Sequence, residues 1–204
     1  MIQAIIFDLG GVLVRTEDPG PRTKYAKKLG LTREELEHTV FDGTSAVRAT
    51  IGEISVAEHW ENVRQQLELS RKEIKTLQDR FWGGDRLDTE LVDYIRSLRG
   101  TYRTALLSNA WSDARRVIHE ELGIEDAFDE LIISAEVHLA KPNPRIFQYT
   151  VDKLGVGARQ AIFVDDFPDN ITSAREFGLN AIRFETALQT RAEMGKLLAG
   201  KSSK

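Results

Sequence analysis

The sequence contains no cysteine, and this absence removes several kinds of chemistry at once. Without thiols the chain has no disulfide, no thiolate zinc site and no cysteine nucleophile. A chain without disulfides is compatible with a reducing compartment. The apolar N-terminus lacks a positively charged leader and carries Asp8 in its middle, which is not typical of a signal peptide. We therefore expect a cytoplasmic protein.

The sequence also lacks a run of residues with the same sign of charge, and it lacks a long apolar run. Its 28 basic and 32 acidic residues leave a net charge of −4, without the basic face that attracts nucleic acid. No apolar stretch approaches the roughly 20 residues that span a bilayer. Nucleic acid and membranes are therefore not expected partners. The length of 204 residues suits one compact domain, or a core domain that carries a smaller insert.

Short apolar runs with the length of β-strands recur along the chain. The runs are Ala4–Phe7, Thr104–Leu107, Glu130–Ile133, Ala161–Val164 and Ala181–Phe184. Continuous apolar runs suit strands that are covered on both faces. Helical patterns, including Thr89–Arg99, Asp113–Leu122 and Arg145–Leu154, separate most of them. This alternation predicts an α/β fold with a doubly wound, Rossmann-like parallel sheet of about five strands.

The region between the first and second runs breaks the alternation. It has little strand signal, and three hydroxyl residues in it each precede a glutamate by three positions, which is typical of a capping box at a helix start. The pairs are Thr32 with Glu35, Ser55 with Glu58, and Ser70 with Glu73. We predict an α-helical cap domain at residues 15–82, inserted in a core domain of residues 1–14 and 83–204. A lid over an active site and a packing or dimerisation module are both open interpretations of the insert.

Polar residues stand where the predicted strands end. Asp8 follows the first run, Ser108 the second, and the pair Asp165-Asp166 the fourth, while Lys141 comes after the third. Because parallel strands end at one edge of a sheet, we expect these groups to meet there. Crowded carboxylates take up protons or share a cation, and oxygen ligands favour magnesium. A cation, a lysine, a hydroxyl and a carboxylate nucleophile together suit phosphoryl transfer.

Each of these residues alone has a plainer interpretation. An aspartate at the end of a strand is more often a cap than a nucleophile, and Ser-Asn after a strand is ordinary turn chemistry. Trp60, Phe81 and Trp82 lie in helical patterns and are expected in the core of the cap. Trp111 either lines a pocket or packs in the interior. Only the joint pattern of polar groups at strand ends favours a functional site.

The four motifs together resemble those of the haloacid dehalogenase-like hydrolase superfamily. They are the runs Ile5–Leu13, Leu106–Asn109, Lys141–Phe147 and Phe163–Asn170. Within the superfamily the chain is most similar to the helical-cap subgroup, which includes sugar-1-phosphate phosphatases and the N-terminal phosphatase domain of soluble epoxide hydrolases. The resemblance implies a magnesium-dependent phosphatase that acts on a small phosphorylated metabolite, with sugar phosphates as one candidate class.

The resemblance also implies a role for the residues that form the metal site. Asp8 would be the nucleophile that carries a covalent aspartyl phosphate, and it would be a magnesium ligand as well. The backbone carbonyl of Gly10 and the carboxylate of Asp166 would be further ligands. Asp165 and Asn170 would orient these groups.

The remaining motif residues are implied to bind the substrate. Ser108 and the backbone of Asn109 would hold the phosphoryl oxygens. Lys141 would offset the negative charge between Asp8 and the phosphate.

One position departs from the family pattern, because Gly10 stands where the family has a second aspartate. That aspartate normally protonates the leaving oxygen and later activates water, and such acid–base groups contribute typically about 10²- to 10⁴-fold. Two alternatives to a phosphatase follow from the departure. One is a catalytically impaired binding protein. The other is a 2-haloacid dehalogenase, although such an enzyme does not need the metal site that Asp165-Asp166 predicts.

Overall fold

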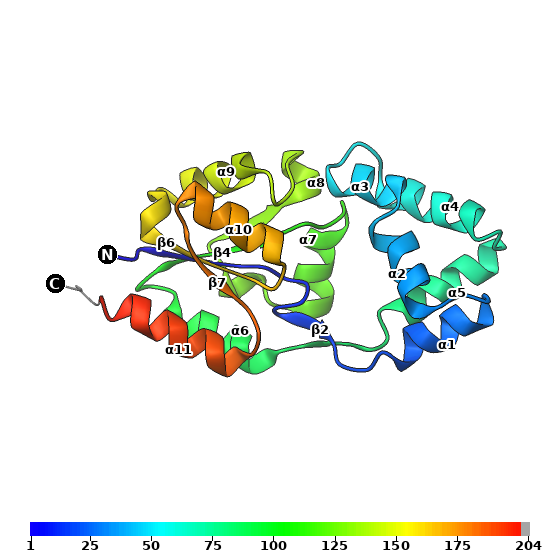
Figure 1. The fold of residues 1–204 in the computed structure, drawn as a ribbon, viewed down its shortest axis with the longest axis horizontal. Coiled ribbons are helices and arrows are strands. Elements are labelled where there is room, and N and C mark those ends of the chain that lie inside the picture. The colour runs from blue at the N-terminus through cyan, green and yellow to red at the C-terminus, as the bar shows by residue number, and fades with distance from the viewer. Residues whose placement is uncertain (201–204) are drawn as a thin grey trace.

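The core of the molecule is a parallel β-sheet of five strands in the order β5-β4-β1-β6-β7 (Figure 1). A computed structural model describes residues 1–200, and residues 201–204 of the predicted core range lie outside the described part. The strands are β1 (Ala4–Phe7), β4 (Arg103–Ser108), β5 (Glu130–Ile133), β6 (Ala161–Asp165) and β7 (Asn180–Arg183). The predicted α/β fold with a doubly wound parallel sheet is therefore confirmed.

Helices cover both faces of this sheet, as the continuous apolar runs predict. In β1, Ile5 and Phe7 face one apolar cluster, whereas Ala4 and Ile6 face another. The first cluster lies under α6 (Thr89–Leu98), α7 (Ala114–Arg116) and α11 (Ala187–Leu198). The second lies under α9 (Pro144–Leu154) and α10 (Pro168–Phe177). Every residue of β1 is fully buried, so the strand that ends at Asp8 is held from both sides.

One predicted helix has a different form. The pattern Asp113–Leu122 gives the short helix α7 and then a π-helical segment, η1 (Val117–Leu122), which ends at Gly123 with a φ of 62°. The short elements η2 (Glu125–Ala127), α8 (Ser134–Val137) and η3 (Ala158–Gln160) complete the core. Among residues 1–200, no helix combines the length and the apolar character needed to cross a bilayer.

Five helices between Thr16 and Asp85 form a separate group, which we call the helical insert (Figure 1). They are α1 (Gly20–Lys28), α2 (Arg33–Phe41), α3 (Thr44–Thr50), α4 (Val56–Gln66) and α5 (Arg71–Phe81). The insert has its own apolar cluster, centred on Leu36, Leu77 and Phe81. All three predicted capping boxes form, at the starts of α2, α4 and α5.

Two of the connections between the helical insert and the core lie far apart along the insert. The chain enters through β2 (Val14–Thr16) and returns through β3 (Asp85–Leu87), and these strands pair as an antiparallel ribbon. The buried Arg22 ties α1 to this ribbon through two hydrogen bonds to Asp85, of 2.9 and 2.8 Å. The second connection joins the loop after α3 to the core, where His138 Nδ1 donates a hydrogen bond of 2.8 Å to the Ile51 carbonyl. The insert therefore rests on the core at more than one place.

Candidate active site

The ends of β1, β4 and β6 bring together the polar residues that the sequence pattern singled out. Phe7 pairs with Leu106 of β4 and with Val164 of β6, so the residues that follow these positions lie at the same edge of the sheet. The backbone N–H of Asp8 donates to the Val164 carbonyl over 2.9 Å, which places Asp8 beside Asp165.

Lys141 lies between two of the aspartates. Its Nζ is 2.9 Å from Asp8 Oδ1 and 2.6 Å from Asp165 Oδ2, and only 4% of the lysine is exposed. Burial opposes the charged form of Lys141, but the two carboxylates outweigh it, so the pKa of Lys141 is raised. The lysine therefore stays charged and neutralises part of the acidic cluster.

The acidic cluster still carries more negative charge than one lysine offsets. Burial raises the pKa of Asp8 to about 7, with Lys141 opposing this rise and Asp165 adding to it. Burial, and then Asp165, also raises the pKa of Asp166 above its ordinary value. Oxygen atoms of Asp8, Asp165 and Asp166 all lie within 4.8 Å of one another. This set of hard oxygen donors fits a divalent cation such as magnesium.

The hydrogen bonds divide the three aspartates into two kinds. Asp165 accepts from Lys141, from the backbone N–H of Phe167 and from Asn170 Nδ2, so both of its oxygens are engaged. Asp8 Oδ1 accepts from the Leu9 backbone N–H over 2.7 Å and faces Lys141, which leaves Oδ2 for a ligand or a substrate. This pattern favours Asp8 and Asp166 as metal ligands, with Asp165 and Asn170 holding the site in place.

Gly11 is required by the close approach of Asp166. A Cβ built at Gly11 would lie 2.2 Å from Asp166 Oδ2, and the residue has a φ of +77°. We predict that Gly11→Ala lowers the affinity for magnesium by displacing this carboxylate, and that it destabilises the fold by more than about 1 kcal/mol.

Gly30→Ala is the matched control for this prediction. Gly30 has nearly the same φ, +74°, but a Cβ there meets nothing within 4 Å. The difference between the two variants in calorimetric magnesium titrations and urea unfolding measures the clash alone. Equal behaviour of the two variants would show that Asp166 moves aside freely.

Asn109 has a contact that the sequence pattern did not predict. Its side chain donates from Nδ2 to the Lys141 carbonyl and accepts the Lys141 backbone N–H at Oδ1, each over 2.8 Å. These two bonds hold the loop that carries Lys141 against the end of β4. The predicted interaction was between the Asn109 backbone and phosphate, so the side chain has a further, positioning part in the site.

Gly10 and Ser108 complete the set. Ser108 ends β4 and is 4% exposed, at the same sheet edge as Asp8. Gly10 is exposed, and a Cβ built on it meets nothing within 4 Å. The missing side chain at position 10 is therefore not a consequence of crowding.

Comparison with known proteins agrees with this geometry. The family described as haloacid dehalogenase-like hydrolase matches residues 2–178. D-ribitol-5-phosphate phosphatase of Bacteroides thetaiotaomicron is 29% identical over 97% of this chain and 99% of its own length. Bifunctional epoxide hydrolase 2 of Sus scrofa is 27% identical over 89% of this chain, which corresponds to 36% of that protein. A haloacid dehalogenase-family enzyme of B. thetaiotaomicron, solved with magnesium and inorganic phosphate, superposes with a TM-score of 0.73 at 26% identity, over 91% of this chain and 95% of that one.

Proposed function

Because the chain belongs to the haloacid dehalogenase-like hydrolase family, we propose that it is a magnesium-dependent phosphatase acting through a covalent phosphate on Asp8. Its substrate in this proposal is a small phosphorylated molecule. The observation that carries the proposal is the cluster of Asp8, Asp165 and Asp166 around Lys141 at the carboxyl edge of the sheet. The related phosphatase and the neighbour bound to magnesium and phosphate support the same reaction class.

Asp8, Asp166 and the Gly10 carbonyl would hold the magnesium ion. When bound, the ion supplies positive charge that offsets the phosphate oxygens. The helical insert acts in this proposal as a cap that covers the site, with residues 15–82 as the cap and the rest of the chain as the core.

The residues of the chain divide the reaction between them. Asp8 Oδ2, which makes no hydrogen bond or ion pair within residues 1–200, forms a bond to phosphorus while the bond from phosphorus to the leaving oxygen breaks. Ser108 and the Asn109 backbone N–H orient the phosphoryl oxygens. Lys141 favours the ionised form of Asp8 against the effect of burial, and it offsets the charge that collects between the carboxylate and the phosphate. Water then hydrolyses the aspartyl phosphate, which restores Asp8.

Because Gly10 provides no acidic side chain, the reaction should favour leaving groups that depart without being protonated. Position 10 has no side chain to act as an acid, and alkyl oxygens depend on such an acid more than aryl or acyl oxygens do. The same absence slows hydrolysis of the aspartyl phosphate, so this intermediate accumulates. Equal rates on alkyl and aryl phosphates, or no trapped intermediate during turnover, would contradict these two statements.

The alternatives make different demands on the site. A haloacid dehalogenase has no use for a cation-binding pair of carboxylates, and chloride release without magnesium would support it. A binding protein without activity would keep magnesium affinity but turn over no ester. The direct test is phosphate release from phenyl phosphate and glucose 1-phosphate, with magnesium and with a chelator. Release that depends on magnesium supports the proposal, and no release from either ester contradicts it.

Magnesium is expected to stabilise the folded protein. An ion that binds only the folded state, at about 100 times its dissociation constant, adds about 2.7 kcal/mol to the free energy of unfolding. We predict that magnesium raises the midpoint of thermal unfolding, and that Asp166→Asn removes most of this rise.

Asp79→Asn is the matched control for this prediction, because Asp79 is an exposed aspartate on α5 of the helical insert. This variant should respond to magnesium as the unchanged protein does. An equal response of the Asp166→Asn variant would place the ion elsewhere.

A further inference from the structure

Three aromatic rings form a continuous group that crosses from the core to the helical insert, and we call this group the aromatic surface. It consists of Phe41 at the end of α2, Trp82 after α5, and Trp111 in the loop that follows β4. The ring centroids are 5.7 Å apart for Phe41–Trp82 and 6.3 Å apart for both Phe41–Trp111 and Trp82–Trp111. Two insert residues and one core residue therefore share one surface.

The aromatic surface is partly open to solvent. Phe41 is 38% exposed and Trp82 is 43% exposed, and Trp111 is half-buried. The prediction that Trp82 belongs to the core of the insert is therefore wrong, whereas Trp60 and Phe81 are buried as expected. Single exposed apolar residues are ordinary, but a contiguous exposed aromatic group marks a binding surface.

A buried arginine packs against two of the three rings and holds them in place. The guanidinium of the buried Arg22 lies 5.7 Å from the Phe41 ring centroid and 5.6 Å from that of Trp82, and its ion pairs with Glu37 and Asp85 keep it there. A surface that is already ordered loses little side-chain entropy when a ligand binds.

Trp111 is held in the same way by His59. The two ring centroids are 4.5 Å apart, and His59 Nδ1 is hydrogen-bonded to Ser45 Oγ over 2.9 Å. His59 is fully buried, so the contact joins the core loop to the interior of the insert.

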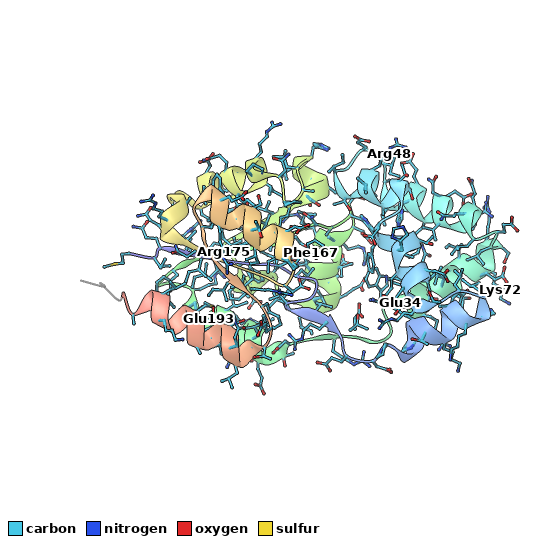
Figure 2. All side chains as sticks on the ribbon, in the orientation of Figure 1. Glu34, Arg48, Lys72, Phe167, Arg175 and Glu193 are labelled. Carbon is cyan, nitrogen blue, oxygen red and sulfur yellow. The ribbon has the colours of Figure 1, made fainter. Side chains whose placement is uncertain are left out.

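The aromatic surface lies within reach of the phosphate end of the candidate site. Trp111 follows Ser108 by three residues, so their Cα atoms are at most about 11 Å apart. On the core side, Phe167 directly follows Asp166 and is 56% exposed. Figure 2 shows Phe167 at the end of the core that faces the helical insert. Aromatic rings therefore stand near both the phosphoryl-binding and the metal-binding residues.

We infer that the aromatic surface receives the leaving group of the substrate, and that this leaving group is a planar aromatic ring, as in an aryl phosphate. This inference rests on the proposed phosphatase function. A planar ring stacks on Phe41, Trp82 and Trp111 in the offset or edge-on arrangements that aromatic pairs prefer. The absence of a side chain at Gly10 points the same way, since a phenolic oxygen, with a pKa of about 10, leaves more readily without an acid than an alcohol does.

The inferred reaction balances without a further reactant. A bond forms between Asp8 Oδ2 and phosphorus, and the bond between phosphorus and the aryl oxygen breaks. The phenolate leaves with the electron pair of that bond and takes a proton from water. A second water then cleaves the phosphorus–oxygen bond of the aspartyl phosphate and releases inorganic phosphate.

Phosphonates test the subsite without depending on turnover. Benzylphosphonate has the shape of phenyl phosphate but cannot be hydrolysed, and propylphosphonate is its counterpart without a ring. We expect benzylphosphonate to bind at least about tenfold more tightly in calorimetric titrations with magnesium, since one favourable aromatic pair alone contributes about two- to tenfold. Trp82→Ala and Trp82→Leu should each reduce this preference to about threefold or less, without weakening propylphosphonate.

Leu188→Ala is the matched control, because Leu188 is 81% exposed and lies on α11 of the core, outside the helical insert. It should leave both affinities unchanged. Equal affinities of the two phosphonates for the unchanged protein overturn the inference. So does cyclohexylmethylphosphonate binding as tightly as benzylphosphonate, since this shows an apolar rather than an aromatic preference.

Two further outcomes separate the explanations. If Trp82→Ala changes the molar mass in solution but not the preference for benzylphosphonate, the aromatic surface joins two copies of the chain and the inference is overturned. If the preference is found but phenyl phosphate is not hydrolysed, the aromatic subsite stands and the proposed phosphatase function fails. If phenyl phosphate is hydrolysed but benzylphosphonate binds no more tightly than propylphosphonate, the phosphatase function stands and the aromatic subsite is overturned.

Discussion

Asp8→Asn is expected to lower kcat for phosphate release by about 10⁴-fold or more, because a carboxamide cannot form the phosphoryl bond. The variant should remain folded. Asparagine has nearly the same shape as aspartate, and Lys141 keeps its 2.6 Å contact with Asp165 after the change. The measurement is phosphate release from phenyl phosphate in the presence of magnesium, together with the midpoint of urea unfolding.

The control for this prediction is Asp152→Asn, which changes an exposed aspartate on α9 whose side chain accepts a hydrogen bond from Gln148. It should retain full activity. A residual rate of one tenth or more in Asp8→Asn, with the fold intact, would mean that Asp8 is not the nucleophile.

Gly10→Asp is expected to raise kcat for propyl phosphate by about 10²-fold, because it supplies the acid that position 10 lacks. The structure has room for the change. A Cβ at Gly10 meets nothing within 4 Å, and Gly10 is not one of the glycines with positive φ. Phenyl phosphate should gain much less, since its leaving oxygen needs less help. The measurement is kcat on both esters, under the same magnesium concentration.

Gly10→Asn separates acid catalysis from all other effects of a side chain at this position. Asparagine has the size and polarity of aspartate but transfers no proton. If both variants change the rate on propyl phosphate equally, the gain comes from packing or from the backbone, and the expected role of the acid is wrong. A gain that only Gly10→Asp shows would explain why the chain as it stands favours good leaving groups.

The parts of the fold that follow local rules could be predicted from the sequence. The run Ala4–Phe7 is apolar at every position because both faces of β1 are covered, and this makes a buried parallel strand recognisable. The capping boxes at Thr32, Ser55 and Ser70 involve residues only three positions apart, so their pairing does not depend on the rest of the fold. The meeting of Asp8, Asp165 and Lys141 followed from one further rule, that parallel strands end at a common edge.

Contacts between distant segments could not be predicted in this way. The two bonds between Asn109 and the Lys141 backbone depend on where the loop after α8 returns to β4. The exposure of Trp82 depends on how α5 meets the ribbon, and its helical pattern favoured a buried position. Nor does the sequence tell that Gly11 lies against Asp166, because the two residues belong to different strand ends. In each case the decisive partner is far away along the chain.

The ribbon of β2 and β3 makes the helical insert a replaceable unit. Thr16 pairs with Asp85, so the two points at which the chain leaves and rejoins the core lie on adjacent strands, about 5 Å apart. A two-residue turn is enough to connect two paired antiparallel strands such as β2 and β3, and a much longer segment can connect them as well. Because β2 and β3 form a sheet separate from the five core strands, a different insert could be carried there if its contacts with His138 and Trp111 were replaced. Specificity for the leaving group would then change by replacement of the whole insert, while the residues around Asp8 stay unchanged.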